Sequence, residues 1–419
     1  MNFLFPTLLL LLFISLDAYL YQALKPRIRG IQKAWLRKTA RGIFIASAVL
    51  SYLSVGIILA YFVFRTMRIQ SVMNLAMMGS VLFLIPKIFG AVVFLIEDIF
   101  RLLGLGIRGT QQLRGKGKPD QPLLPSRRKF VGQLGVIALG LPFASILYGI
   151  TKGKYAYQVR ELSLHFPDLP KAFDGFKIAQ ISDIHSGSFD SLSGVRKGIS
   201  LLMEQAADMI LFTGDIVNNR AAELEPWLDE FGKLSAPYGV HSVLGNHDYG
   251  DYVSWESQDA KETNLQQLKN FHRHMGFNLM LNRNQIIEKD GEKIALLGVE
   301  NWGKPPFPQH GDLQRALQGT EEVPFKILMS HDPSHWDGEI IDHPDHIHLT
   351  LSGHTHGMQF GIEIPGWRWS PVKYRYPRWA DLHQEKGQYL YVNRGFGFLG
   401  FPGRVGIWPE ITIINLRTA

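Results

Sequence analysis

The sequence predicts a region of membrane-spanning α-helices followed by an α/β domain. Four long apolar runs fill most of residues 1–150. After them, short apolar runs alternate with amphipathic helical stretches, which implies crossover connections and a largely buried sheet. Several short runs end in a turn that carries Asp, Asn or His, as expected where strand ends build a shared site. We therefore place a transmembrane region at residues 1–150 and a globular domain at residues 151–419.

The four apolar runs have the length that a transmembrane helix needs. A helix spans a bilayer with about 20 mostly apolar residues, and the runs cover residues 3–24, 43–64, 72–96 and 130–150. The first run lacks a basic start and a small-residue cleavage site, so we expect a membrane helix rather than a signal peptide. Asp17 and Lys87 fall inside the runs, where an ionisable residue suggests a function. We expect instead that Asp17 lies near an interface and that Lys87 reaches an interface or pairs within the bundle.

Two basic tracts beside these runs predict the orientation of the protein. Residues 25–41 hold seven basic residues and no acidic one, and residues 101–129 hold eight basic residues and Asp120. The positive-inside rule places both tracts in the cytoplasm, so the globular domain should lie on the extracytoplasmic side of the cell (inner) membrane. The rest of the chain has 29 basic and 36 acidic residues, which argues against a nucleic-acid partner.

The segment SRRKF at residues 126–130 precedes the fourth apolar run. It resembles a twin-arginine export motif in an internal position. The alternative is that its basic residues only flank the cytoplasmic end of a helix. Both interpretations give the same orientation.

The elements of the globular domain follow one another in a regular order. We expect strands at residues 157–166, 173–183, 208–215 and 238–248, with helices at residues 188–205, 221–234 and 264–274. Residues 279–301 should form a hairpin that turns at Asp290–Gly291. Further strands are expected at residues 325–333 and 346–357. Residues 389–395 and 403–416 should close the second sheet.

Five strand ends carry candidate metal ligands. These ends supply Asp183 and His185, then Asp215, then Asn246 and His247, then His331, and last His354 and His356. Asp, Asn and neutral His suit Mn, Fe, Zn or Mg, and the chain has no cysteine to provide a thiolate. Each residue alone could occupy an ordinary turn. All five segments together favour a site for two divalent ions, which can clamp both oxygens of a phosphoryl transfer.

The five segments resemble the motifs of the calcineurin-like metallophosphoesterases, which read DxH, GDxxxN, GNHD or GNHE, a lone His and GHxH. The resemblance covers about residues 160–419 and implies a four-layer αββα sandwich of two sheets flanked by helices. It assigns Asp183, His185 and His356 to a first metal ion, Asn246, His331 and His354 to a second, and Asp215 to both. Met358 stands in the last motif where the family usually has Gly.

The resemblance also implies a reaction. Water or hydroxide held between the two ions would attack phosphorus, and His247 would act as the acid beside the leaving group. We expect Asp248 to orient His247, and we consider Arg394 and Arg404 as phosphate contacts. A domain anchored outside the membrane would hydrolyse a phosphoester or pyrophosphate, and we expect a lipid-linked or envelope-associated substrate.

Other interpretations fit parts of the sequence. A non-catalytic membrane scaffold or receptor with a metal-stabilised ectodomain would need the ligands but not His247. A transporter would use Asp17 and Lys87, but four helices are few for that function. Residues 367–379 interleave aromatic and basic side chains, which suit lipid headgroups, a sugar or aromatic group beside a phosphate, or ordinary packing.

The remaining histidines near the last strands need not bind metal. We expect structural or surface positions for His241, His343, His346 and His348, and we keep His335 as a weaker alternative ligand.

Overall fold

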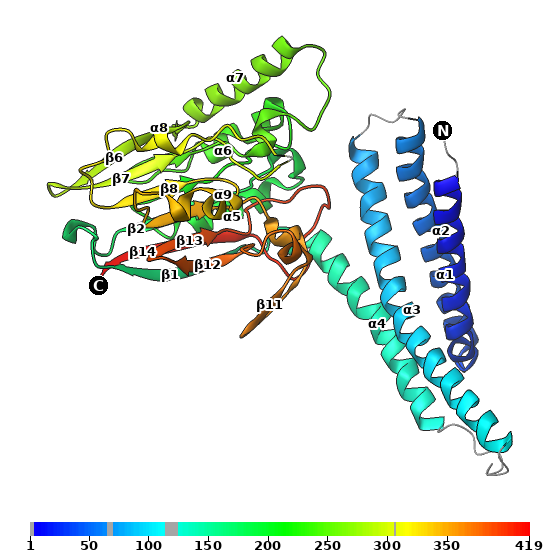
Figure 1. Cartoon of the computed structure of the whole chain (residues 1–419). Coiled ribbons are helices and arrows are strands. Elements are labelled where there is room, and N and C mark those ends of the chain that lie inside the picture. Colours follow the sequence, from blue (N-terminus) through cyan, green and yellow to red (C-terminus); the bar gives the residue numbers. More distant parts are fainter. Residues whose placement is uncertain (1–3, 65–69, 114–124, 306) are drawn as a thin grey trace. The chain divides into compact units, whose positions relative to one another are not determined.

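The computed structural model describes residues 4–64, 70–113, 125–305 and 307–419. Contacts divide the chain into two compact units that meet between Tyr148 and Gly149. Figure 1 draws the helices of the first unit in blue to cyan and the strands of the second in green to red. Residues 114–124, which include much of the second basic tract, lie outside the described residues, and SRRKF falls at the start of a helix.

Among the described residues of the first unit, four helices are long and apolar enough to cross a membrane. They are α1 (Leu4–Arg29), α2 (Ala34–Phe64), α3 (Gln70–Leu113) and α4 (Pro125–Thr151). Their apolar windows, Thr7–Arg29, Ala34–Ala60, Val72–Gly106 and Phe130–Thr151, overlap the four predicted runs. Many of their large apolar side chains are exposed, as expected of helices that face lipid.

Asp17 and Lys87 pair with each other inside the first unit, so Lys87 pairs within the bundle as expected, whereas Asp17 is buried in this pair. Nζ of Lys87 lies 2.9 Å from Oδ1 of Asp17 and donates to Oγ of Ser51 at 3.1 Å. The three residues come from α1, α3 and α2, and all three are buried. Because an unpaired charge among apolar helices is costly, the pair and its hydroxyl partner stabilise one arrangement of these helices.

The described part of the second unit contains two mixed six-stranded sheets. In spatial order the first sheet has β1 (Gln158–Phe166), β14 (Glu410–Thr418), β2 (Lys177–Ile181), β3 (Met209–Phe212), β4 (Val240–Ser242) and β5 (Phe277–Leu279). The second has β12 (Asp381–Glu385), β13 (Gln388–Val392), β9 (Leu349–Ser352), β8 (Lys326–Met329), β7 (Glu292–Gly298) and β6 (Arg283–Lys289). A separate hairpin pairs β10 (Ile362–Ile364) with β11 (Trp367–Trp369).

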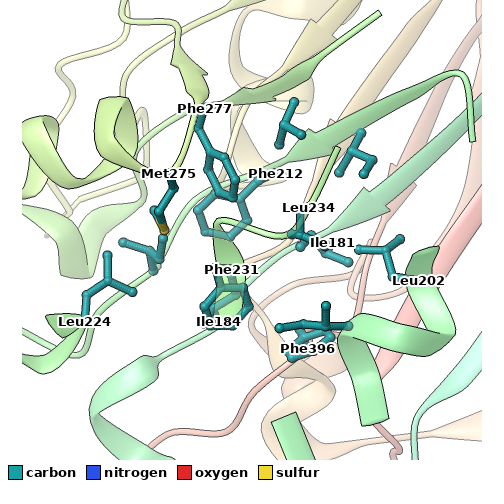
Figure 2. Packing of buried hydrophobic residues seen from close by; sticks show 14 of the residues in the cluster. Ile181, Ile184, Leu202, Phe212, Leu224, Phe231, Leu234, Met275, Phe277 and Phe396 are labelled. Atoms are coloured by element: carbon teal, nitrogen blue, oxygen red, sulfur yellow. The ribbon is translucent and has the colours of Figure 1, made fainter. Parts of the chain in front are cut away.

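Apolar residues alternate between separate layers of the core. Along β2, Ala179 and Ile181 face the helices of the first sheet, and Figure 2 shows Ile181 in this cluster. Ile178 instead packs into the layer that joins the two sheets. On the other side of the second sheet, Leu297 and Leu328 pack among helical residues. The order helices, sheet, sheet, helices confirms the predicted four-layer sandwich.

The flanking helices are short except for one. They are α5 (Leu192–Met203), α6 (Leu228–Phe231) and α7 (Gln258–His274) on the first sheet, and α8 (Leu313–Leu317) and α9 (Ser334–Gly338) on the second. α7 begins six residues before the predicted helix, because Oγ of Ser257 accepts from N of Ala260 and caps it. The predicted helix at residues 221–234 is divided into 3₁₀ turns and α6, with Pro226 at the start of the second turn.

The prediction that residues 403–416 close the second sheet is wrong. β14 lies in the first sheet, parallel to β1 and antiparallel to β2. A strand that is buried on both faces has no polar face to indicate its neighbours, so its apolar run did not identify the correct sheet. The predicted hairpin at Asp290–Gly291 is confirmed, since β6 and β7 pair from Lys289–Glu292 outward.

Candidate metal centre

The ends of five strands from both sheets supply the predicted ligands. β2, β3 and β4 are parallel neighbours in the first sheet, and β8 and β9 are parallel neighbours in the second. Directly after these strands come Asp183, Asp215, Asn246, His331 and His354. Because parallel strands end at the same edge, the two sheets bring side chains from distant segments to one place.

The first group of ligands consists of Asp183, His185 and His356, whose donor atoms all lie within 4.8 Å of one another. Nε2 of His356 lies 3.0 Å from Nε2 of His185 and 3.2 Å from Oδ1 of Asp183. All three residues are buried. Two ring nitrogens and a carboxylate oxygen at this separation have more lone pairs than protons, and a divalent cation satisfies that excess.

The second group consists of Asp215, His331 and His354, again within 4.8 Å of one another. Oδ2 of Asp215 lies 3.1 Å from Nε2 of His331 and 3.6 Å from Nε2 of His185. Oδ1 of Asn246 lies 2.8 Å from Nδ1 of His354. The structure therefore brings all seven predicted ligands together, with the Asp215 carboxylate between the two groups.

Neighbouring groups fix the orientation of the histidine rings. Nδ1 of His331 lies 2.7 Å from the carbonyl oxygen of Thr213 and must donate to it, because a carbonyl can only accept. In neutral His331 the Nε2 atom therefore carries a lone pair, and this lone pair faces Asp215. Nε2 of His354 contacts the hydroxyl of Tyr376 at 2.7 Å, and a hydroxyl can donate or accept. The ring of His354 can thus present Nδ1 to a cation without losing this partner.

The backbone is strained at most of the candidate ligands. Five of the seven are non-glycine residues in the left-handed region, with φ values of 53°, 48°, 60°, 71° and 51° for Asp183, His185, Asp215, His354 and His356. Such conformations cost of order 1–3 kcal/mol each and cluster at functional sites. The carboxylates also hold the backbone in place, since Asp183 accepts from N of His354 and Asp215 accepts from N of His247.

The buried charges shift one another's pKa values. Burial opposes ionisation of Asp215, but the imidazoles of His331 and His247 outweigh it and hold the pKa of Asp215 well below its usual range. Burial likewise opposes protonation of His331, but the Asp215 carboxylate outweighs it and raises the pKa of His331 to about 10. Burial lowers the pKa of His185 well below its usual range. A cation at this site would replace the His331 proton that balances Asp215.

The predicted role of Asp248 as the orienting partner of His247 is wrong. The fully buried Asp248 carboxylate accepts from the backbone N–H groups of Asp215, Ile216 and Gly245, each at 2.9 Å. It therefore cross-links the loop that carries Asp215 to the loop that carries His247. Burial and the Asp215 charge raise the pKa of Asp248 to about 7, although backbone donors oppose the shift.

His247 is oriented by a backbone carbonyl instead. Its Nδ1 donates to the carbonyl oxygen of Asn218 at 2.7 Å, and its ring lies 5.0 Å from the ring of His185. The side chain of Asn218 bonds to Ser188 and supports the same loop. Because Nδ1 carries the proton, Nε2 is the atom of His247 that can exchange a proton with a bound molecule.

The predicted phosphate contacts, Arg394 and Arg404, are not available to a substrate in this structure. Both side chains are fully buried. The guanidinium of Arg394 bonds to three carboxylates at 2.6–2.9 Å, those of Glu363, Asp381 and Glu410. Arg404 donates to the carbonyl oxygens of Arg394 and Gly397 at 2.8 Å. These arginines hold the loop behind Asp183 in place, and the interpretation as substrate contacts is wrong for this conformation.

A cavity of about 180 Å³ opens beside the two ligand groups. It is lined by His185, Asp215, Asn246, His247, Tyr252, Phe307, His354, His356 and Leu399. The sequence did not single out Tyr252, Phe307 or Leu399 as site residues, whereas Tyr376 lies in the aromatic and basic segment 367–379, for which contact with a substrate was one interpretation. Tyr252 accepts from Nδ2 of Asn246 at 2.8 Å, and its position five residues after His247 was the available signal. Phe307 and Leu399 come from loops whose local sequence carries no signal for the site.

The other histidines have structural partners. His335 contacts Oγ of Ser330 through Nδ1 and Glu339 through Nε2, so neither ring nitrogen is left for a metal ion. His348 lies between the backbone N–H of Lys326 and Asp168. The alternative ligand His335 is therefore excluded in this structure, and the expected structural role of His348 is confirmed.

Two protein-family models match the chain. Residues 1–154 match the model described as "Probable Calcineurin-like phosphoesterase, transmembrane domain". Residues 176–358 match the model described as "Calcineurin-like phosphoesterase". The second match includes all seven candidate ligands together with His247 and Asp248.

Curated relatives match more than half of the chain. "Uncharacterized metallophosphoesterase YkuE" of Bacillus subtilis is 30% identical over 303 residues, which are 70% of this chain and 98% of the relative. "Transmembrane protein with metallophosphoesterase domain" of Danio rerio is 27% identical over 68% of this chain and 63% of its own length. "Phosphodiesterase YaeI" of Escherichia coli is 26% identical over 58% of this chain and 82% of its own length.

Proposed function

The chain belongs to the calcineurin-like metallophosphoesterases, and we propose that it hydrolyses a phosphoester or pyrophosphate bond of a lipid-linked or envelope-associated substrate. The convergence of seven oxygen and imidazole donors from both sheets is the observation that carries the proposal. The cavity beside these donors gives a substrate access, and its volume of about 180 Å³ far exceeds the roughly 10–15 Å³ that one water needs.

The donor set fits two divalent cations. Asp183, His185 and His356 would hold one, and Asn246, His331 and His354 would hold the other. Asp215 would contact both. Mn, Fe, Zn or Mg at these positions would supply a water nucleophile at ordinary pH and neutralise charge on the phosphoryl group.

The side chains of this protein would perform the remaining steps. His247, held through Nδ1 by the Asn218 carbonyl, presents Nε2 to the cavity and can donate a proton to the departing oxygen when its ring carries a second proton on Nε2. Phe307 and Leu399 give the same cavity an apolar lining, which would strengthen the electrostatic interactions inside it once a bound substrate displaces the water. Asn246 keeps its place through its bond to Tyr252.

His247→Ala tests the proposed reaction in purified full-length protein. With Mn and bis-p-nitrophenyl phosphate, we expect kcat to fall by about 10²–10⁴-fold, the range of general acid–base catalysis, while the metal content stays unchanged. His346→Ala is the matched control, because His346 is exposed and does not line the cavity. A metal-loaded wild type that is inactive, or as active as His247→Ala, would refute the proposal and favour a non-catalytic scaffold or receptor.

The extracytoplasmic position of the globular unit is the second part of the proposal. The basic residues 25–41 connect α1 to α2, and the positive-inside rule assigns this connection to the cytoplasm. With four spans, the end of α4 then lies outside. Protease added to intact spheroplasts of the cell should digest residues 151–419. Digestion only after lysis would place the unit in the cytoplasm and make a cytosolic lipid precursor the better substrate.

A further inference from the structure

The hairpin β10–β11 presents an apolar face to solvent. Ile362 pairs with Trp369 and Ile364 pairs with Trp367, so these four side chains share one face of the hairpin. Exposed fractions are 48% for Ile362, 57% for Ile364 and 51% for Trp367. A soluble surface rarely gathers such side chains on one short element, and an exposed apolar patch marks an interaction site. In Figure 1, β11 projects away from both sheets.

The opposite face of the hairpin is fixed to the globular unit by charge. Glu363 and Arg368 pair across the hairpin and point away from the apolar face. Glu363 forms ion pairs with Arg160 and Arg394, each at 2.6 Å, and Arg368 contacts the carboxylate of Asp381. The polar face is thus held inward and the apolar face outward. Because these ion pairs fix the hairpin, the exposure of its apolar side chains is a property of an ordered element.

The base of the hairpin lies where the chain leaves its last membrane span. The span Phe130–Thr151 ends inside the globular unit, whose first residue is Gly149. Arg404 donates its backbone N–H to the carbonyl of Gly149 at 3.2 Å. The next residue, Val405, forms a β-bridge with Phe360, two residues before β10. The Phe360–Val405 bridge and the Arg404–Gly149 hydrogen bond therefore connect the base of the hairpin to the end of the last candidate span.

We infer that the Ile362, Ile364 and Trp367 face of the hairpin inserts into the interfacial layer of the bilayer that the helices span. Trp is enriched at that layer, where an apolar ring meets a wet, polar edge. The exposed Lys373 and Arg375 follow the hairpin and suit anionic headgroups. Proximity to the membrane exit favours the bilayer over a second copy of the chain or another protein. The inference does not depend on the proposed reaction.

An insertion of this kind would also reach the metal centre through the loop that follows β9. Oγ of Ser370, directly after β11, donates to the carbonyl of Gly357 at 2.7 Å. Oγ1 of Thr355 donates to the carbonyl of Trp379 at 2.6 Å. Gly357 and Thr355 flank the ligand His356. If the β10–β11 hairpin inserted into the bilayer, the loop that carries His356 would therefore lie close to the membrane surface.

Cysteine labelling tests the inference, because the chain has no cysteine of its own. Ile364→Cys carries an environment-sensitive fluorophore in the full-length protein, reconstituted in nanodiscs that contain anionic phospholipid. We expect a blue shift relative to a water-exposed probe, and quenching by lipids with a quencher near the headgroup. Glu288→Cys in β6 is the matched control, since Glu288 lies on the far edge strand of the second sheet and has a 61% exposed side chain. Its probe should stay in water.

Each other outcome overturns the inference. Equal quenching of both probes by aqueous iodide would place the hairpin in water. Shielding of the Ile364→Cys probe that grows with protein concentration, and not with lipid, would assign the face to a second copy of the chain. Equal quenching of both probes by lipid would show no specific contact. Unchanged metal content and unfolding temperature establish that each labelled variant is folded.

Discussion

His272 is a buried histidine outside the metal centre, and its protonation limits the stability of the protein in acid. Its Nδ1 contacts Oγ of Ser242 at 2.9 Å, and burial lowers the pKa of His272 to about 3. In the unfolded chain a histidine has a pKa of about 6.5. Between these values the unfolded state binds a proton that the folded state does not.

The folded state should therefore lose stability as the pH falls from about 6.5 to about 3, by up to about 1.4 kcal/mol per pH unit from His272 alone. Above pH 6.5 this contribution is absent. His272→Gln keeps a hydrogen-bonding group and should flatten the pH dependence of the unfolding temperature. His274→Gln, on the exposed side of the same helix, is the control and should leave the slope unchanged. Equal slopes for wild type and His272→Gln would contradict the assignment.

Met358 is a strained residue beside the ligand His356. Its φ is 54° and its side chain is 57% exposed, so packing contributes little to its conformation. Glycine adopts this conformation without the Cβ penalty of about 1–2 kcal/mol but loses about 0.5–1 kcal/mol of chain entropy. Met358→Gly should therefore stabilise the protein by about 0.5–1 kcal/mol, measured by thermal unfolding. Met358→Ala retains the strain, and equal stability of the two variants would refute this account.

At the level of single residues, the sequence predicted the candidate metal ligands better than the hydrogen-bond and ion-pair partners of the residues around them. Asp183, Asp215 and His331 were identified because each follows a buried strand, and the structure brings them together. The role of Asp248 depends on backbone N–H groups of another loop, which no residue pattern reveals. Arg394 is neutralised by carboxylates from three separate segments, so its burial was not predictable from its own neighbourhood.

Among the elements, the helices of the first unit depend most on one buried ion pair. Lys87→Met leaves Asp17 buried without its partner, and removing one member of such a pair costs about 3–5 kcal/mol. We expect a lower unfolding temperature of the purified protein in detergent. The double variant with Asp17→Asn should recover most of the loss. Lys38→Met, at an exposed position of α2, is the control. A Lys87→Met protein as stable as wild type would show that the pair contributes nothing.

Some elements were predictable from local signals in the sequence, and others were not. Apolar length located the membrane spans, and Asp290–Gly291 located the hairpin, because both signals are local. The sheet that contains β14 was not predictable, since a strand buried on both faces carries no information about its neighbours. Capping by Ser257 placed the start of α7 before the apolar pattern began.

For the whole molecule, the candidate ligands come from both sheets, so ions held by them would join the two sheets. Asp183, Asp215 and Asn246 follow strands of the first sheet, whereas His331 and His354 follow strands of the second. Ions held by both sets cross-link the sandwich, so metal binding should stabilise the fold as a ligand does.

Removal and return of metal test this cross-link. Stripping the protein with a chelator should lower its unfolding temperature, and Mn at 100 times its Kd should restore about 2.7 kcal/mol. Binding should also release protons, because the Asp215 carboxylate raises the pKa of His331 and a cation would displace the proton that this favours. Asp215→Asn should abolish both effects, and His346→Ala should retain them. A chelated protein with unchanged stability would mean that the donors do not bind ions that matter to the fold.

The contact between Gly149 and Arg404 has a mechanical consequence. Arg404 donates its backbone N–H to the carbonyl of Gly149 near the end of the last candidate span, while its guanidinium lies 3.3 Å from Nδ1 of the ligand His356. Arg404 thus contacts both the end of α4 and the candidate metal centre. A shift of the end of α4 would therefore change the surroundings of His356 directly through Arg404.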